Sequence, residues 1–173
     1  MANRNVHYEA AFEDYLRVRG IPYVAVDEAK KSIFGKIALK SFDFVVYSSG
    51  QANLLVDVKG RMFPDSTPGH KRSTRRAWEN WVTRGDIEGL GKWSQIFGLG
   101  FRPMLLFAYW LQGPPERSPF EEVHFFRDKS YSFVAVPLGE YVALARPRSA
   151  KWQTMDAPAG EFSRLARDVA SFL

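Results

Sequence analysis

The sequence contains no cysteine, which excludes disulfides and thiolate metal sites. It also lacks any apolar run long enough to span a bilayer, and it has no tandem repeat or low-complexity tract. Its first seven residues, Met1 to His7, contain no apolar core of a signal peptide. These absences lead us to expect a soluble protein of the cytoplasm with no membrane partner.

The composition predicts a folded domain with an affinity for polyanions. Hydrophobic residues make up 46% of the chain and aromatic residues 15%, which argues against disorder. With 173 residues the chain is most simply one domain over 1–173. The net charge is +5, and most of this excess lies in a basic insertion at about 61–85. That insertion holds six Lys or Arg residues against two acids.

Residues 41–61 are the segment around which we expect the fold to be organised. Two apolar, β-rich runs flank a polar turn at 48–51, which is the pattern of a β-hairpin. Because strand side chains alternate between faces, Asp57 and Lys59 should point to the same side of the sheet. A turn centred at 49–51 places Asp43 opposite or diagonal to Asp57.

The two facing carboxylates predict a metal site. Like charges opposite one another in a sheet are destabilising, and a carboxylate in an apolar setting is costly without a compensating charge. Oxygen ligands on a rigid strand pair suit Mg²⁺ or Mn²⁺. We expect Asp43 and Asp57 to bind the ion, with Lys59 steadying a water or the charge on a phosphate. The alternative is that Lys59 simply pairs with both aspartates on a solvated sheet face.

A first helix is predicted over residues 5–19, where apolar side chains recur at helical spacing. Its acids would usually be ordinary solvated positions. Glu9 lies at the edge of the buried stripe, where it could reach a site at the end of the sheet. Glu13, one turn later on the same side, is the competing candidate.

The rest of the chain predicts further strands and helices in an α/β arrangement. Strands are expected at 21–26, 33–40, 103–111, 123–126, 131–138 and 141–145, turns at 27–32, 128–130 and 139–140, and helices at 86–97 and from 156 onward. Asp86 is expected to be the N-cap of the helix that Gly98 ends. The apolar stripe of the last helix would pack on the sheet or on a second subunit.

The basic insertion predicts a nucleic-acid contact. Cations neutralise phosphates and aromatic rings stack on unpaired bases, and here Trp78 and Trp81 are interleaved with the cations. The two tryptophans are also spaced to form one buried face of a short helix. Two polar side chains of the following helix are further candidates. The full set of expected nucleic-acid contacts is Arg61, Lys71, Arg72, Arg75, Arg76, Arg84, Lys92 and Gln95.

The ordered set Glu9, Asp43 and Asp57-Val58-Lys59 resembles the PD-(D/E)xK nuclease superfamily. Its pattern is a glutamate on the first helix, an aspartate opening a strand, and an acid-x-Lys on the paired strand. Within it the chain is similar to archaeal Holliday-junction resolvases in Tyr8-Glu9, in the separation of the two aspartates and in the stretch 90–98. The run His7-Tyr-Glu-Ala-Ala-Phe-Glu13 also resembles a group of uncharacterised bacterial proteins of the HYExAFE type.

The resemblance implies a restriction-endonuclease-like fold, in which helices flank a mixed central sheet. It implies an Mg²⁺-dependent DNA endonuclease, structure-specific as the resolvases are, that acts as a homodimer. Asp43, Asp57 and the Val58 carbonyl would hold the metal, and Glu9 would contribute directly or through water. Lys59 would orient the nucleophile.

The chain also departs from the superfamily pattern. Phe42 stands where the superfamily has its name-giving proline, and neither the basic insertion nor the strands after Gly113 belong to the resolvase pattern. Two alternatives therefore stay open. One is a DNA-binding or scaffolding subunit of the same fold with an inactive site, and the other is an RNase or toxin-type nuclease.

Overall fold

The structure is a computed structural model, which describes residues 6–27, 39–50, 52–66 and 77–173. Its helices are α1 (Val6–Val18), α3 (Arg84–Phe97), α4 (Leu138–Leu144) and α5 (Ala159–Leu165), with the 3-10 turns η2 (Pro115–Arg117) and η3 (Val169–Phe172). Its strands are β1 (Tyr23–Ala25), β2 (Phe44–Val46), β3 (Asn53–Phe63), β4 (Val82–Thr83), β5 (Phe101–Leu111), β6 (His124–Phe126), β7 (Lys129–Pro137), β8 (Arg146–Ser149), β9 (Thr154–Asp156) and β10 (Arg167–Asp168). None of the helices in these ranges is long and apolar enough to cross a membrane.

A mixed seven-stranded sheet forms the centre of the molecule. Its order is β1-β2-β3-β5-β7-β10, and β6 pairs with β7 outside this path. Strands β3 and β5 run parallel, from the pair Asn53↔Phe101 to the pair Phe63↔Leu111, and the other neighbours are antiparallel. A small second sheet has the order β4-β9-β8.

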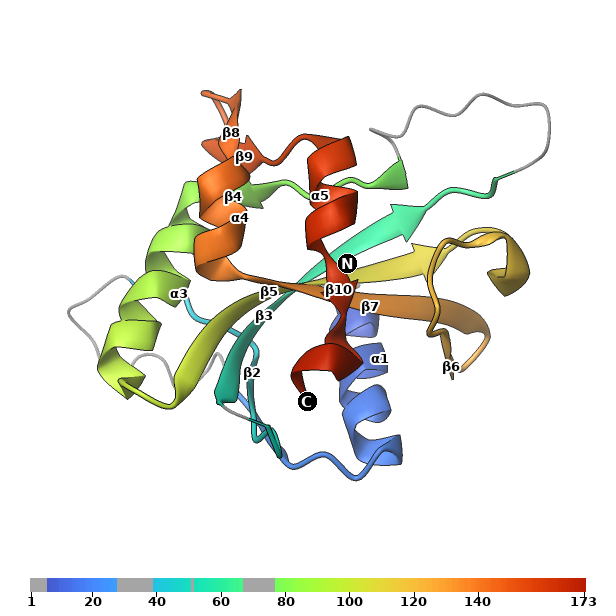
Figure 1. Cartoon of the computed structure of the whole chain (residues 1–173), viewed down its shortest axis with the longest axis horizontal. Helices are drawn as coiled ribbons and strands as arrows, with labels where there is room; N and C mark the ends of the chain where they lie inside the picture. Colours follow the sequence, from blue (N-terminus) through green and yellow to red (C-terminus); the bar gives the residue numbers. More distant parts are fainter. Residues whose placement is uncertain (1–5, 28–38, 51, 67–76) are drawn as a thin grey trace.

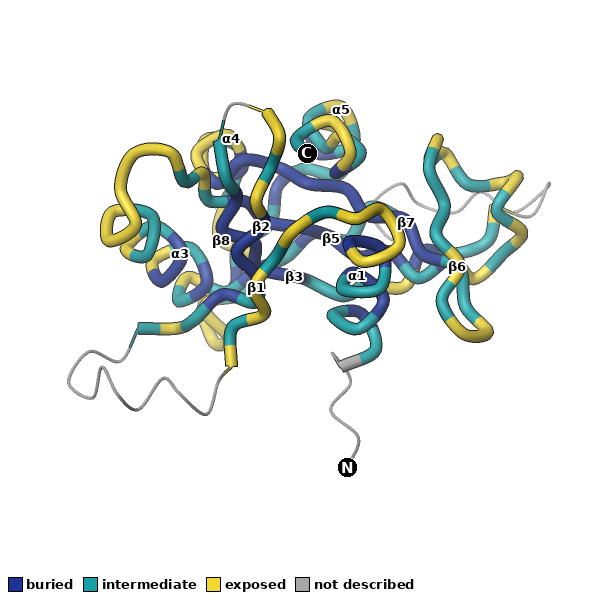
Figure 2. The backbone as a smooth tube through the Cα atoms, turned by 90° about the horizontal axis from the view of Figure 1, so that it is seen from below, coloured by how far each residue is buried: buried dark blue, intermediate teal, exposed yellow. Residues whose placement is uncertain are grey.

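Helices cover both faces of the central sheet (Figure 1). On β3, Leu54, Val56 and Val58 belong to the core cluster beneath α1. Leu55 points the other way, into the cluster that takes Leu90 of α3 and residues of α4 and α5. Figure 2 shows the result, because the tube is dark blue through the middle of the sheet and yellow at the outer turns. Because both faces of β3 and β5 are buried, the sequences of these two strands are nearly continuous apolar runs.

Helix α1 lies very close to β3 at one position. A Cβ at Gly60 would overlap the ring of Tyr8, so no side chain fits there. The first helix can pack on the strand that carries Asp57 and Lys59 only because the residue after Lys59 is glycine. This contact sets the position of Glu9, the residue after Tyr8.

The hairpin, the first helix, the second helix and the mixed α/β class are confirmed. Strands β2 and β3 pair antiparallel as expected, and Gly98 ends α3 with a φ of 78° that favours glycine. The expected turn at 128–130 is shifted, because β7 already begins at Lys129. The expectations for 27–32 and 33–40 fall almost entirely outside the described residues.

Four expectations were wrong. Residues 141–144 form helix and not strand, with Ala145 as the C-cap, and the expected turn at 139–140 is the first part of this helix, α4. The N-cap of α3 is Thr83, while Asp86 is the N3 residue of a capping box. The last helix ends at Leu165, after which β10 pairs with β7.

Candidate active site

Asp43 and Asp57 lie on neighbouring strands in the arrangement that the hairpin pattern predicts. The β2–β3 register pairs Phe44 with Val56, so one step further along the hairpin Asp43 lies opposite Asp57. The Asp43 main-chain N–H donates to the Val56 carbonyl at 2.9 Å. Its carboxylate accepts a hydrogen bond from the Val58 N–H at 2.7 Å. The strand pair thus fixes the Asp43 side chain next to β3.

Lys59 lies on the Asp57 side of β3 and holds two carboxylates together. Its Nζ lies 3.0 and 2.9 Å from the two oxygens of Asp57 and 3.1 Å from Oδ1 of Asp86. Lys40 forms a second ion pair with Asp86. Lys59 therefore has two acidic partners and not one, and the second comes from helix α3.

Asp86 is the site residue that sequence reasoning missed. It was identified only as a helix cap, yet its side chain is buried and reaches the lysine of the acid-x-Lys motif. The helix start positions it, because Asp86 Oδ2 accepts from the Thr83 N–H at 2.8 Å and Thr83 Oγ1 accepts from the Asp86 N–H at 3.1 Å. The spacing Thr83-x-x-Asp86 is a capping-box signal, but it does not reveal the contact with Lys59.

The electrostatics of the three aspartates differ. Burial raises the pKa of Asp57, and the charges of Asp43 and Asp86 raise it further, against the opposing effect of Lys59. Burial also raises the pKa of Asp43, and the charge of Glu9 adds to this effect. Burial alone would raise the pKa of Asp86, but Lys59, Lys40 and the Thr83 N–H outweigh it and lower that pKa to about 2. Asp86 is therefore the firmly ionised partner of Lys59, whereas the facing pair repel each other.

The structure separates the two candidate acids of the first helix. Glu9 is near enough to Asp43 for its charge to raise the pKa of that carboxyl. Glu13 accepts a hydrogen bond from the Tyr23 hydroxyl at 2.8 Å and pairs with Arg17 at 3.3 Å. Glu9 is thus the helix-one acid whose charge acts on Asp43, and Glu13 is engaged at the β1 side of the helix.

Lys59 and Asp86 line a cleft of about 820 Å³, together with residues of α1, β3 and the segment before α3. Asp57 is almost fully buried, with 5% of its surface exposed, so it lies behind Lys59 and not on the cleft surface. Tyr8, Arg61 and Trp81 also line the cleft. Asp57 is therefore covered by Lys59 on the cleft side.

The expected nucleic-acid contacts fall into three groups. Lys71, Arg72, Arg75 and Arg76 lie outside the described residues. Arg84, Lys92 and Gln95 are exposed on α3. Arg61 is directed inward: its guanidinium donates to the carbonyls of Gly60, at 2.7 Å, and of Trp81, and it lies 4.1 Å from the centre of the Trp81 ring. Arg61 therefore holds Trp81 against β3.

The tryptophans of the basic insertion have separate roles, and they do not share one helix face. Trp78 packs edge-on against Phe63, Tyr109 and Phe120 in the core on the α3 side. Trp81 lies between the cleft and a neighbouring cavity and donates from Nε1 to Glu79 at 3.0 Å.

The donor set of the facing aspartates fits a hard divalent cation. Mg²⁺ in proteins uses one or two carboxylates and completes its shell with water and phosphate. Asp43 and Asp57 supply two carboxylates whose repulsion such an ion would relieve. Within the described ranges, however, no group of three or more His, Asp or Glu residues is arranged to hold a metal.

Comparisons with known proteins place the fold. No family model matches the chain, and no curated protein matches it. Its structure is similar to that of Hjc, a Holliday junction resolvase from the archaeal hyperthermophile Archaeoglobus fulgidus. The TM-score is 0.54 over 96% of this chain and 98% of that chain, at 14% sequence identity. The curled mixed sheet between two helical layers is thus the fold of an Hjc-like nuclease, as the arrangement of acids in the sequence predicted.

Proposed function

We propose that this protein is a metal-dependent endonuclease that hydrolyses phosphodiester bonds in DNA. The observation that carries the proposal is the placement of Asp43 opposite Asp57 on paired strands, with Lys59 on the Asp57 side at the border of a cleft. The Hjc-like fold supports it, because Hjc is a Holliday junction resolvase. Structure-specific cleavage and a homodimer belong to the same proposal.

Each residue of the site has a distinct role in the proposal. Asp43 and Asp57 would hold Mg²⁺ or Mn²⁺, with the Val58 carbonyl as a further ligand and Glu9 acting directly or through water. The ion supplies stabilisation of the negative charge that develops on a phosphate. Lys59 keeps its positive charge, since Asp57 and Asp86 outweigh the effect of burial and raise its pKa. A protonated ammonium at the cleft would orient the nucleophile or donate to a phosphate oxygen.

A second candidate is a DNA-binding or scaffolding subunit of the same fold without catalysis. Two observations favour it: Lys59 is engaged by two carboxylates, and Asp57 is nearly inaccessible. An ion-paired network of this kind can also be purely structural. The two candidates differ in one respect. In the nuclease, Asp57 is required for cleavage of DNA with a divalent cation, whereas in the scaffold no cleavage depends on it.

Cleavage assays distinguish the candidates. The wild type, Asp43→Asn and Asp57→Asn are incubated with Mg²⁺ and supercoiled plasmid, four-way junctions or RNA. As a control we choose Asp128→Asn, whose side chain is 82% exposed. We expect the wild type and the control to cut DNA and the two site variants to lose activity by about a hundred-fold or more, because residues that act as a unit fail together. DNA binding without Asp57-dependent cutting would establish the scaffold, and cutting of RNA alone would establish a ribonuclease.

Metal binding can be measured separately from DNA cleavage. Mn²⁺ is expected to raise the Tm of the wild type, since an ion that binds only the folded state stabilises it. Asp43→Asn should lose this increase while keeping an acceptor for the Val58 N–H. An equal Mn²⁺-induced shift in both proteins would show that the facing aspartates do not hold the ion.

A further inference from the structure

The hairpin of β8 and β9 carries cations and an exposed aromatic ring that the proposed chemistry does not use. Arg146, Arg148 and Lys151 are all exposed, and residues 146–152 contain no acid. Trp152, at the tip, has 68% of its surface exposed. The Lys151 ammonium lies 5.1 Å from the centre of this ring. The tip of the hairpin therefore presents an indole and cations that are all accessible to a ligand.

The hairpin is attached directly to the candidate active site. Strand β9 pairs with β4, and Thr154 is the partner of Thr83, the N-cap of the helix that carries Asp86. The next residue along, Arg84, donates from its main-chain N–H to the Gln153 carbonyl at 2.9 Å. A molecule held on the hairpin is therefore held at a fixed distance from Lys59 and Asp86.

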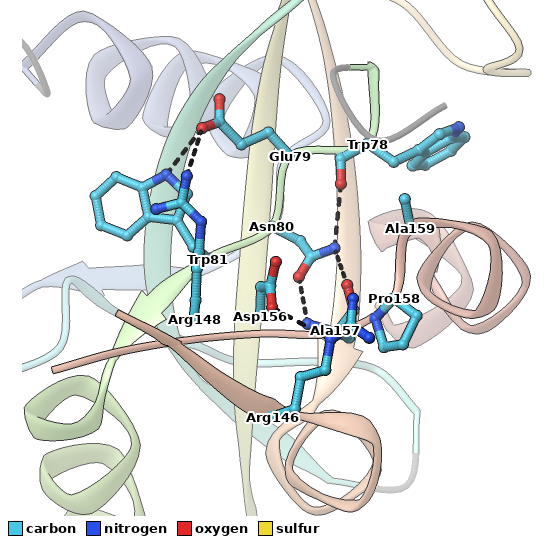
Figure 3. Close-up of a pocket in the computed structure, with 10 residues that line it drawn as sticks. All are labelled: Trp78, Glu79, Asn80, Trp81, Arg146, Arg148, Asp156, Ala157, Pro158 and Ala159. Carbon is cyan, nitrogen blue, oxygen red and sulfur yellow. Dashed lines mark hydrogen bonds and ion pairs between the residues drawn. The ribbon is translucent and has the colours of Figure 1, made fainter. Parts of the chain in front are cut away.

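A cavity of about 560 Å³ opens beneath the hairpin (Figure 3). Arg146 and Arg148 line it from one side, and Glu79 and Trp81 line both this cavity and the cleft that contains Lys59. Figure 3 shows Arg148 beside the Trp81 indole and directed toward Glu79. The cavity and the cleft are thus neighbours with a common wall.

The two arginines of the hairpin are only loosely paired. Arg148 lies 4.0 Å from Glu79 and Arg146 lies 3.7 Å from Asp156. Both guanidinium groups are accessible, with 38% and 60% of their side chains exposed. Ion pairs of this length at the surface contribute little, so the guanidinium groups can exchange these carboxylates for phosphates at small cost.

We propose that the β8–β9 hairpin binds an unpaired stretch of the DNA substrate beside the cleft. The arginines and Lys151 contact phosphates, and Trp152 stacks on a base that has no partner strand. Stacking on a protein ring needs a free base face, which a base inside a continuous duplex does not offer. The inference rests on the proposed nuclease function and adds a substrate feature to it: a fork, junction or single strand next to the bond that is cut.

Binding measured without divalent cations tests the inference separately from catalysis. Fluorescence anisotropy in EDTA compares a blunt duplex with a forked duplex of the same sequence. We expect Trp152→Ala to weaken binding of the fork about ten-fold, the size expected for loss of one stacked base, and to change binding of the blunt duplex less than two-fold. A 2-aminopurine placed in the unpaired arm should be quenched by the wild type and not by Trp152→Ala.

Matched variants control for general surface effects. Phe125→Ala removes an aromatic ring that is 67% exposed on β6, and we expect it to leave binding of both DNAs unchanged. Arg148→Ala should weaken binding of the fork, whereas Arg102→Ala, on β5 and paired with Glu140 at 3.5 Å, should not. Because Trp152 is exposed, its replacement should leave the Tm unchanged.

The outcomes separate the two proposals. Equal weakening of fork and blunt duplex by Trp152→Ala, or no weakening at all, overturns the role of the hairpin even if the wild type cuts DNA in an Asp57-dependent way. Trp152-dependent binding of the fork by a protein that does not cut with Mg²⁺ supports the hairpin and overturns the nuclease.

Discussion

At the scale of single residues, the most informative contact is that of Lys59 with two carboxylates of different character. Asp57 lies on the same strand as Lys59, and burial raises its pKa. Asp86 comes from α3, and its pKa is lowered to about 2. Lys59 therefore keeps a permanent anionic partner even if Asp57 turns to another ligand. A cation could bind at Asp57 without leaving the lysine unpaired, which is costly for a buried charge.

The low pKa of Asp86 predicts how stability depends on pH. Its pKa in the folded protein, about 2, lies below the ordinary value of 3.8. Ionised Asp86 therefore stabilises the fold above pH about 4, by about 2 kcal/mol, and this contribution is lost as the pH falls from about 4 to about 2. Asp86→Asn should lower the free energy of unfolding by about this amount at pH 7 and by much less near pH 2, measured by urea denaturation.

Asp128→Asn is the control for this pH profile, because its side chain is 82% exposed and surface ion pairs contribute little. The profile of this variant should follow that of the wild type. If Asp86→Asn were equally destabilising at pH 7 and pH 2, the loss would come from the helix cap and not from the ionised pair.

The site residues were predictable to the extent that they are local in sequence. Period-two alternation placed Lys59 beside Asp57, and the hairpin turn placed Asp43 opposite it. Asp86 lies in a different element, and nothing in its neighbours encodes how α3 docks on β3. A contact between distant elements depends on packing that a single sequence pattern does not contain.

At the scale of elements, the start of α3 connects three parts of the site. Thr83 pairs with β9, caps the helix through Asp86 and accepts a hydrogen bond from Lys40 at 3.2 Å. The capping box thus fixes the helix, the hairpin and the carboxylate that holds Lys59. A change at this one hydroxyl should affect both stability and catalysis.

Thr83→Ala tests this connection. Loss of an N-cap side chain costs about 1 kcal/mol, so we expect a decrease of this size in the free energy of unfolding. The cleavage rate should fall by more than the decrease in the folded fraction explains, because Asp86 loses one of the hydrogen bonds that position it. Thr83→Ser keeps the hydroxyl and should retain both the stability and the activity of the wild type. Chemical denaturation and plasmid cleavage measure the two. Equal behaviour of the two variants would contradict the role of the hydroxyl.

The elements that were wrongly predicted have a physical explanation. The segment 141–145 is short and mostly apolar, so its pattern does not distinguish a strand from a helix. The helix forms where the Tyr141 hydroxyl donates to the Asn80 carbonyl at 2.7 Å. In the last segment, Phe162 and Val169 have helical spacing but lie in the two different cores, on opposite faces of the sheet. Their spacing therefore matches that of a helix by chance. Between them the chain passes from one face of the sheet to the other and pairs with β7 as β10.

At the scale of the whole molecule, five exposed cations lie on the cleft, at the start of α3 and on the hairpin. They are Lys40, Arg84, Arg146, Arg148 and Lys151. Lys59 and Asp86 line the same cleft as Lys40, and Asp57 is buried against Lys59. An anionic polymer would therefore be attracted to the side of the molecule on which Lys59 and Asp86 lie.

This distribution predicts the salt dependence of DNA binding. Each phosphate neutralised by a cation releases counterions, which gives a slope of about −0.9 per contact when log K is plotted against log salt concentration. If the five cations around the cleft and hairpin all contact phosphates, the slope for the wild type should be about −4 to −5, measured by anisotropy in EDTA. The double variant Arg146→Ala, Arg148→Ala should reduce its magnitude by about 2.

The matched control for the salt experiment is the double variant Arg17→Ala, Arg102→Ala. It removes the same net charge from two arginines that are also accessible and ion-paired, with 66% and 44% of their side chains exposed. A general effect of net charge would change binding in both double variants to the same extent. A change of slope in the hairpin variant alone would instead show that these two guanidinium groups contact phosphates, since only direct contacts release counterions one by one.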